Sequence, residues 1–293
     1  MLEEESMQVL IRRALPSDAA RCGQIMFEAF MSIADRHHFP PDFSSIEQAT
    51  QVAAYLIGHD HFYAVVAERE GRVLGSNFLA ETDPIRAVGP ISVDPSVQER
   101  GVGRLLMGAV LERASSAVGV RLVQDAFNAV SMALYASLGF EVREPLVLIS
   151  GRPVGERRRD VEVRPMHRRD IDQCAALCER VHGTARAHEL REALSGFAPF
   201  VACRDGRVRA YATTLTLWQV AHGVAESDEE MEQLILVAGA AQPDPVSFLL
   251  PTRQAALFRW CLAAGLRIVK PLTLMTLRAY QEPTGCYFPS VAY

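Results

Sequence analysis

Apolar and polar residues alternate with two different periods along this chain, which indicates both strands and helices. Short apolar runs predict strands at residues 62–67 and 122–127. Between them, five apolar positions recur at the spacing of one helical face: Val102, Leu105, Leu106, Ala109 and Val110. The pairs Glu70-Gly71 and Asp205-Gly206 each separate two apolar runs, a pattern typical of β-hairpins. We therefore expect mixed α and β structure.

The pattern occurs twice, in the same order. Residues 11–18 and 163–170 each begin as a short apolar strand, continue through Arg to a polar turn with Asp, and lead into an amphipathic helix. Further along each half a helix closes on glycine, Gly139 or Gly265, and a strand follows. The spacing between matching positions shrinks along the chain, so the second copy is the shorter one. We predict tandem copies of one α+β unit.

The two copies are joined by residues 151–160, which are rich in Gly, Pro and charge and have no apolar period. Such a stretch predicts an exposed connector. We expect one domain over residues 1–150 and a second over 161–293, since a chain of 293 residues is long enough for about two domains. The aromatic last stretch, residues 281–293, predicts a docked strand or extended segment.

Charge and hydropathy exclude several functional classes. Thirty Lys and Arg against thirty-five Asp and Glu give a formal net charge of −5, which argues against a broadly basic nucleic-acid-binding protein. No apolar run approaches ~18 residues, so no membrane span is expected. The acidic start, residues 1–6, lacks the basic and apolar regions of a signal peptide. We expect a cytoplasmic protein without nucleic-acid or membrane partners.

The cysteines indicate neither a disulfide scaffold nor a metal site. Six of them are spread over 293 residues, too sparsely for a disulfide framework. Cys174 and Cys178 lie four residues apart on one helix face, but no second Cys/His pair follows at ligand spacing. We expect buried, reduced thiols and no metal.

A strand, a glycine-containing turn and a helix start follow one another in the first half. The strand-like run 88–93 is ended by Asp94-Pro95, and Gln98-Glu99-Arg100-Gly101-Val102-Gly103 leads into the helix. The first-turn N–H groups of a helix favour an anion, and glycine lets the backbone approach it closely. Arg100 and Arg104 add positive charge. The segment predicts a phosphate site, although its two glycines can also serve a tight turn alone.

A second motif follows the turn. Asn128 is a good N-cap for a helix that carries Leu134-Tyr135 and ends at Gly139-Phe140. Together, Gln-x-x-Gly-x-Gly, Asn and Leu-Tyr-x-x-x-Gly-Phe at these spacings resemble the GNAT (Gcn5-related N-acetyltransferase) superfamily over residues 8–149. The resemblance implies an α+β fold class, with two GNAT-like units that are each a mixed, twisted, mostly antiparallel sheet flanked by helices. It also implies that acetyl-CoA lies where the sheet splays open, with its pyrophosphate on residues 98–103.

The resemblance implies transfer of an acetyl group from acetyl-CoA to the primary amine of a small molecule or peptide by direct attack. A backbone N–H near Ser92 or Val93 would stabilise the oxyanion. Tyr135 takes the position of the family's general acid, and a core-packing role for it stays open. Asn128 contacts the pantetheine or only caps its helix. The expected cofactor-binding residues are Ile91, Ser92, Val93, Gln98, Glu99, Arg100, Gly101, Val102, Gly103, Arg104, Asn128 and Tyr135.

No residue is marked as the general base. Glu81 is the candidate that we name, beside Asp83 and Asp94, and each of these carboxylates can equally be a solvated loop residue. Two other functions stay open: a CoA-binding or sensing module without turnover, and an acyltransferase that uses a longer acyl-CoA.

The second half lacks the phosphate motif. No Gly-x-Gly occurs between residues 217 and 236, and five carboxylates within residues 226–232 would repel a pyrophosphate. Cys261 stands where Tyr135 stands in the first half. We therefore expect a degenerate second copy without catalysis, which braces the first copy, closes over the acceptor or carries a homodimer contact.

Overall fold

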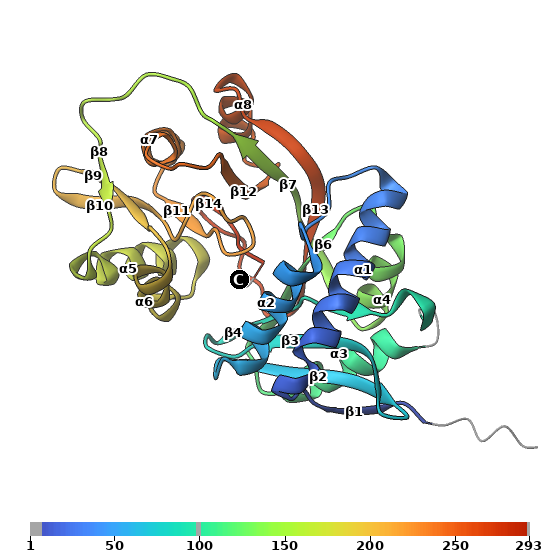
Figure 1. The fold of residues 1–293 in the computed structure, drawn as a ribbon. Helices are drawn as coiled ribbons and strands as arrows, with labels where there is room; N and C mark the ends of the chain where they lie inside the picture. Colours follow the sequence, from blue (N-terminus) through green and yellow to red (C-terminus); the bar gives the residue numbers. More distant parts are fainter. Residues whose placement is uncertain (1–7, 98–100, 292–293) are drawn as a thin grey trace, which may run out of the picture. The chain divides into compact units, whose positions relative to one another are not determined.

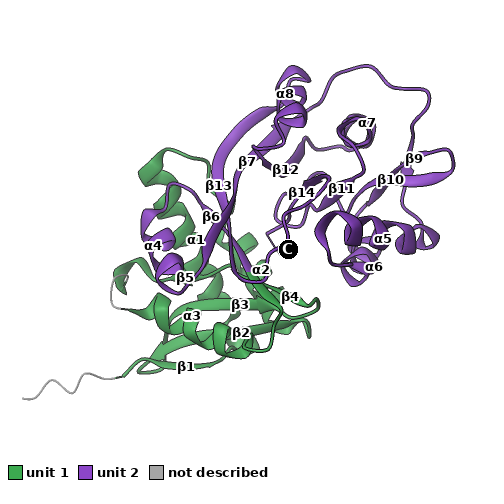
Figure 2. Cartoon of the chain, turned by 180° about the vertical axis from the view of Figure 1, so that it is seen from behind, with its two compact units in different colours: residues 1–120 green, residues 121–293 purple. Residues whose placement is uncertain are grey.

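Figure 1 shows the fold in a computed structural model, which describes residues 8–97 and 101–291. The chain divides into two compact units between Val120 and Arg121 (Figure 2). In the described part of the chain, no helix has both the length and the hydropathy that a membrane span requires.

Unit 1 combines a mostly antiparallel sheet with helices that cover both of its faces. Its elements are β1 (Leu10–Arg13), η1 (Pro16–Asp18), α1 (Ala19–His37), α2 (Ile46–Gly58), β2 (Phe62–Arg69), β3 (Arg72–Ala80), β4 (Ile85–Val88), β5 (Ser92–Val93), η2 (Pro95–Val97) and α3 (Val102–Arg113). β1, β2 and β3 are antiparallel neighbours, and β4 and β5 both pair with β3.

The central strands of unit 1 are buried on both faces, which explains why residues 62–67 form a continuous apolar run. Successive side chains of a strand alternate between its faces. Phe78 therefore packs with the buried residues of α1 and α2, whereas its neighbour Asn77 donates a hydrogen bond to the Leu106 carbonyl of α3 at 3.4 Å.

Unit 2 begins within β6 (Gly119–Asp125). Its further elements are α4 (Ala129–Ser137), β7 (Glu141–Gly151), β8 (Glu162–Pro165), η3 (Arg168–Asp170), α5 (Ile171–His182), α6 (Ala187–Gly196), β9 (Phe200–Arg204), β10 (Arg207–Ala212), β11 (Gly223–Ala225), α7 (Asp228–Ala240), β12 (Val246–Pro251), α8 (Ala255–Ala263), β13 (Arg267–Arg278) and β14 (Cys286–Phe288). Residues 152–158, in the predicted connector, form no helix or strand and are exposed apart from Pro153.

The long strands of unit 2 come from both sequence copies and alternate in one ladder. The strand order is β6-β13-β7-β12, so β13 of the second copy lies between two strands of the first, and β7 of the first lies between two strands of the second. Val147 of β7 lies opposite Leu250 of β12 and Pro271 of β13, both antiparallel. Figure 1 shows β7 and β13 as long, twisted neighbours. This exchange explains why the compact units divide near residue 120, while the domain boundary at 151–160 stays a prediction from the repeat.

The same ion pair closes the first turn of both copies. Arg12 donates to Asp18 at 2.7 Å, and Arg164 donates to Asp170 at 2.7 Å. Each aspartate also accepts a hydrogen bond from the backbone N–H three residues before it, at 2.7 and 2.8 Å. The Arg-to-Asp pattern that recurs in the sequence is therefore one structural motif used twice, and the predicted α+β fold is confirmed.

A second sheet of unit 2 has the order β14-β11-β10-β9-β8, with antiparallel pairs throughout. The strand β14 pairs with β11, and the ring of Phe288 in β14 lies 4.9 Å from that of Phe248 in β12. The Gln254 amide donates to the Tyr287 carbonyl at 2.5 Å and accepts from the Tyr287 N–H at 2.9 Å. The aromatic stretch is thus docked as a strand, as predicted, within the residues described.

Candidate functional site

A β-bulge separates β4 from β5 along their common partner β3. Val88 lies opposite Leu79 and Ser92 lies opposite Ser76. The chain therefore advances four residues from Val88 to Ser92 where β3 advances only three. The extra residue, in the stretch that includes Ile91, turns the strand away from its partner. Bulges of this kind are frequent next to active sites. This one lies directly before the backbone at which the oxyanion donor was predicted.

The strand β5 and the helix α3 both pack closely against β3 at Gly75. A Cβ at this position would lie 2.5 Å from the Ser92 carbonyl oxygen and 3.1 Å from a methyl group of Leu106 in α3. Only glycine fits where backbone approaches backbone so closely. Unit 1 therefore brings the predicted residues of β5 and those of the α3 region onto one part of β3.

The helix α3 begins directly after Gly101, which has a left-handed backbone (φ 80°) and open space where a Cβ would stand. Its first turn holds Val102, Gly103 and Arg104 and contains no acidic residue. Val102 is buried and fixes the helix start, whereas Arg104 is exposed. First-turn N–H groups have no partner within their own helix, and together with the positive charge they suit an anion. The predicted residues Gln98, Glu99 and Arg100 lie outside the described part of the chain.

In unit 2, Asn128 caps α4, as the sequence predicts. Its side-chain oxygen accepts a hydrogen bond from the Ser131 N–H at 3.2 Å. The Ser131 hydroxyl donates in turn to the Gln124 side chain of β6 at 2.8 Å, which ties the helix start to the strand. The capping role of Asn128 is thus confirmed, and its contact with pantetheine stays a prediction.

Tyr135 lies in the same helix and is buried, with its ring 6.1 Å from that of Phe140 in an edge-to-face arrangement. Burial, together with the negative charge of Asp125, raises the pKa of Tyr135 well above its ordinary value. The phenol therefore keeps its proton at neutral pH, which a general acid requires. The burial fits the core-packing role as well, and the catalytic role stays a prediction.

Two of the three carboxylates considered as bases, Glu81 and Asp94, are held by arginines. Glu81 accepts two hydrogen bonds from Arg113, at 2.9 and 3.1 Å. Asp94 is buried beside Arg21, at 2.5 Å, and Arg72, at 2.7 Å. Burial would raise the pKa of Asp94, but hydrogen bonds from Ser96 and Arg72 and the charge of Arg21 outweigh it and hold the pKa at about 2. Asp94 is therefore too weak a base to take a proton from an amine, and Glu81 stays the candidate.

The second half has a different environment at the matching positions. The first turn of α7 carries Asp228, Glu229 and Glu230, and Arg204 pairs with Glu230 at 2.8 Å and with Glu229 at 3.3 Å. Cys261 is buried, and burial raises the pKa of its thiol to about 12. An acidic helix start and a neutral buried thiol offer an anionic cofactor no counterpart of the site in the first half.

Comparison with known proteins assigns the family. The acetyltransferase (GNAT) family model matches residues 27–140. N-alpha-acetyltransferase RimI of Mycobacterium tuberculosis is 33% identical over 152 residues, which cover 49% of this chain and 87% of that protein. Mycothiol acetyltransferase of Thermomonospora curvata is 40% identical over 78 residues, 26% of each chain. The chain belongs to the GNAT acetyltransferase family.

Two solved structures share the fold over nearly the whole chain. A Pyrococcus horikoshii protein assigned to the acetyltransferases covers 100% of this chain and 98% of its own, with a TM-score of 0.74 and 18% identity. A GCN5-related N-acetyltransferase from Sphaerobacter thermophilus covers 94% and 97%, with a TM-score of 0.61 and 15% identity. Both halves of the chain are thus part of a fold that other proteins have.

Proposed function

We propose that the chain is an acetyl-CoA-dependent N-acetyltransferase that acts on a primary amine. The observation that carries the proposal is the bulged strand β5 followed by the glycine-capped start of α3, inside the segment that matches the family model. The relative RimI is an N-alpha-acetyltransferase, which makes a peptide α-amine the first acceptor to test and a small-molecule amine the second.

The residues of the first half fit an acyl-CoA. Gly101 has no side chain in the way, the first turn of α3 has no acid, and Arg104 adds a positive charge near a pyrophosphate. When bound, the cofactor supplies an activated thioester. Backbone N–H groups at Ser92 and Val93 are the proposed donors to the carbonyl oxygen, an arrangement that is typically worth about 3 kcal/mol in the transition state.

A proton donor and a proton acceptor complete the proposal. Tyr135 holds a proton that it can give to the departing sulfur, because its raised pKa keeps the phenol neutral. Glu81 is the proposed acceptor for the proton of the amine, but its carboxylate is held in an ion pair with Arg113. Release of Glu81 from Arg113 would then be part of acceptor binding.

Binding of acetyl-CoA is the first test, by thermal shift with the full chain. A ligand at about 100 times its Kd stabilises a protein by about 2.7 kcal/mol, so absence of any shift at saturating acetyl-CoA would refute the proposal. Release of the CoA thiol is then followed over a panel of amines that includes peptides with free N-termini. Binding without turnover on any amine would favour a CoA sensor, and faster turnover of longer acyl-CoAs would favour an acyltransferase that uses a longer acyl-CoA.

The role of Tyr135 has its own variant. Tyr135→Phe is expected to lower kcat by about 100-fold or more and leave acetyl-CoA affinity unchanged. Cys261→Ala changes the matching position of the second half and is expected to leave kcat unchanged, which makes it the control. Full activity of Tyr135→Phe on a real acceptor would show that the tyrosine only packs the core.

A further inference from the structure

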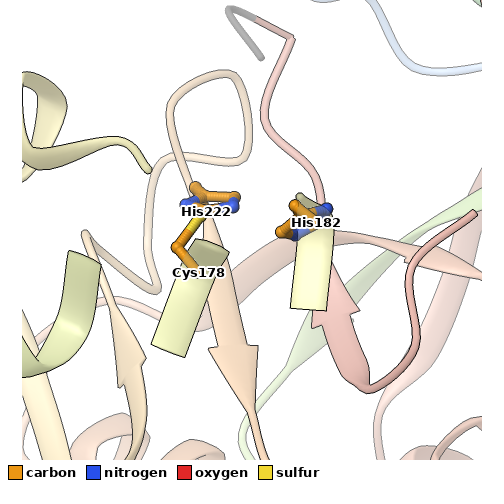
Figure 3. Close-up of side chains that lie close together, drawn as sticks. All are labelled: Cys178, His182 and His222. Carbon is orange, nitrogen blue, oxygen red and sulfur yellow. The ribbon is translucent and has the colours of Figure 1, made fainter. Parts of the chain in front are cut away.

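A buried cluster of three metal-ligating side chains lies in unit 2, on residues that the proposed function does not use. Cys178 and His182 are four residues apart on α5 and lie on one face of that helix. His222 directly precedes β11. The Cys178 sulfur and one nitrogen of each histidine all lie within 4.8 Å of one another, and all three residues are buried. Figure 3 shows the three side chains together, from α5 and from the segment that enters β11.

We propose that Cys178, His182 and His222 bind a zinc ion. A thiolate and two neutral imidazoles are a ligand set that Zn²⁺ prefers. Ligand atoms of a tetrahedral zinc site, at about 2.0–2.3 Å from the metal, lie roughly 3.5 Å apart. The cluster therefore needs to contract by about an ångström around the ion. On binding, the Cys178 thiol loses its proton to solvent and the sulfur forms the bond to the metal.

The surroundings orient His222 for this role. Its Nδ1 lies 3.4 Å from the Tyr211 hydroxyl and 3.6 Å from a carboxylate oxygen of Glu189. In metal sites, one ring nitrogen of a histidine ligand commonly faces such a polar partner and the other faces the metal. This leaves Nε2 of His222 as the proposed ligand atom.

The cluster also holds its imidazoles in the ligand form. Burial, together with the charges of Arg186 and Arg121, lowers the pKa of His182 and of His222 well below the ordinary value. These two positive charges also oppose a cation, but Glu189 pairs with Arg186 at 2.8 Å and offsets one of them. The thiolate of Cys178 would offset further charge.

The site joins parts of the chain that are distant in sequence. The expectation of no metal rested on spacing, because no Cys/His pair follows Cys174 and Cys178 at ligand distance along the chain. Folding instead brings His222 beside α5, and the ring of His182 lies 4.7 Å from that of Tyr287 in β14. A bound ion would link α5 to the segment that enters the strand β11. This role is independent of acyl transfer in the first half.

Cobalt is the probe for the site, because a thiolate bound to Co²⁺ has a charge-transfer band in the near ultraviolet and zinc displaces it. The full chain, stripped with a chelator, is titrated with Co²⁺. We expect one equivalent per chain, a thiolate–cobalt band, and loss of that band on addition of Zn²⁺. Cys178→Ser is expected to remove the band. Cys174→Ser is the matched control, since Cys174 is also fully buried on α5 one turn earlier, and it should keep the band.

A second variant keeps the test decisive if Cys178→Ser fails to fold. His222→Gln retains the thiolate and is expected to weaken Co²⁺ binding at least tenfold, with far-UV circular dichroism unchanged. Absence of a thiolate band in the unmodified chain would overturn the proposal. So would a band that Cys174→Ser removes, or a Co²⁺ affinity that His222→Gln leaves unchanged.

Discussion

The ion pair between Lys270 and Asp125 gives the sharpest test of the exchanged strands in unit 2. Lys270 of β13 comes from the second copy and Asp125 ends β6 of the first, and their charged atoms lie 2.6 Å apart. The Lys270 side chain is 2% exposed and also lies over the Trp218 ring, at 5.3 Å. Lys270→Met keeps the length of the stem but leaves the Asp125 carboxylate without its ammonium partner.

The expected cost follows from burial. Removal of one partner of a buried ion pair typically destabilises a protein by about 3–5 kcal/mol. Asp125 is 14% exposed, so water can reach part of its carboxylate and the low end applies. Loss of the contact with Trp218 adds up to about 1 kcal/mol. We expect Lys270→Met to lower the free energy of unfolding of unit 2 by about 3–4 kcal/mol.

A double-mutant cycle separates the coupling energy of Lys270 and Asp125 from the other effects of each substitution. Asp125→Asn alone leaves a buried ammonium and is also costly, whereas the double variant leaves no unpaired charge. The double variant should therefore cost at least about 2 kcal/mol less than the sum of the two single variants. Urea unfolding is followed by tryptophan fluorescence, because Trp218 and Trp260 both lie in unit 2, with circular dichroism as a second probe. A coupling below about 0.5 kcal/mol would show that solvent screens the pair and that it does not hold β13 to β6.

Three further predictions concern single positions. The folded pKa of Asp94, about 2, lies below its unfolded value near 3.8, so its contribution is present above pH 4 and is lost as pH falls through 2. Asp94→Asn should thus lower the free energy of unfolding by about 2 kcal/mol at pH 7 and by about half that at pH 3, as measured by urea unfolding. A cost that does not change with pH would contradict this. Gly223→Ala should lower the free energy of unfolding by about 1–3 kcal/mol, because the new Cβ would lie 2.2 Å from the Phe288 ring. Gly108→Ala, in open space on α3, is its control and should raise the free energy of unfolding by about 0.5–1 kcal/mol. Asn128→Ala should cost about 1 kcal/mol through the lost cap and Asn128→Ser much less, and a rise in the Kd for acetyl-CoA in both variants would show contact with the cofactor.

Local features of the fold could be predicted from the sequence because local chemistry decides them. Both acidic-Gly hairpins form, with Glu70 and Asp205 in the left-handed region before their glycines. The helix after Gly101 and the cap at Asn128 follow from backbone groups that need nearby partners. The Arg-to-Asp turn could be recognised as a repeat since its ion pair closes within seven residues, as at Arg12.

The sequence alone could not predict which strands pair with one another. The apolar patterns of β7 and β13 predict strands, but an apolar strand can pair with any other, and only the tertiary packing selects β13 for the place between β6 and β7. The proposed zinc ligands could not be found from spacing for the same reason, because His222 is far from Cys178 in sequence and spacing rules compare only residues that are close along the chain. The extra residue between Val88 and Ser92 became visible only once the register with β3 was known.

The two halves differ at the helix start where the first half has its candidate cofactor site. In the first half a glycine start keeps the beginning of α3 open and without acids, whereas α7 begins with carboxylates that Arg204 neutralises. The fourth strand of the second copy, β11, pairs at its outer edge with β14, whose Phe288 packs on β12 and against Gly223. We therefore do not expect a Gly-x-Gly introduced at the start of α7 to create a cofactor site, because β14 stabilises β11 with backbone and aromatic contacts that a ligand would have to replace. In the second half the chain's own residues pack beside β11, and this is the physical reason why chemistry is proposed only for the first half.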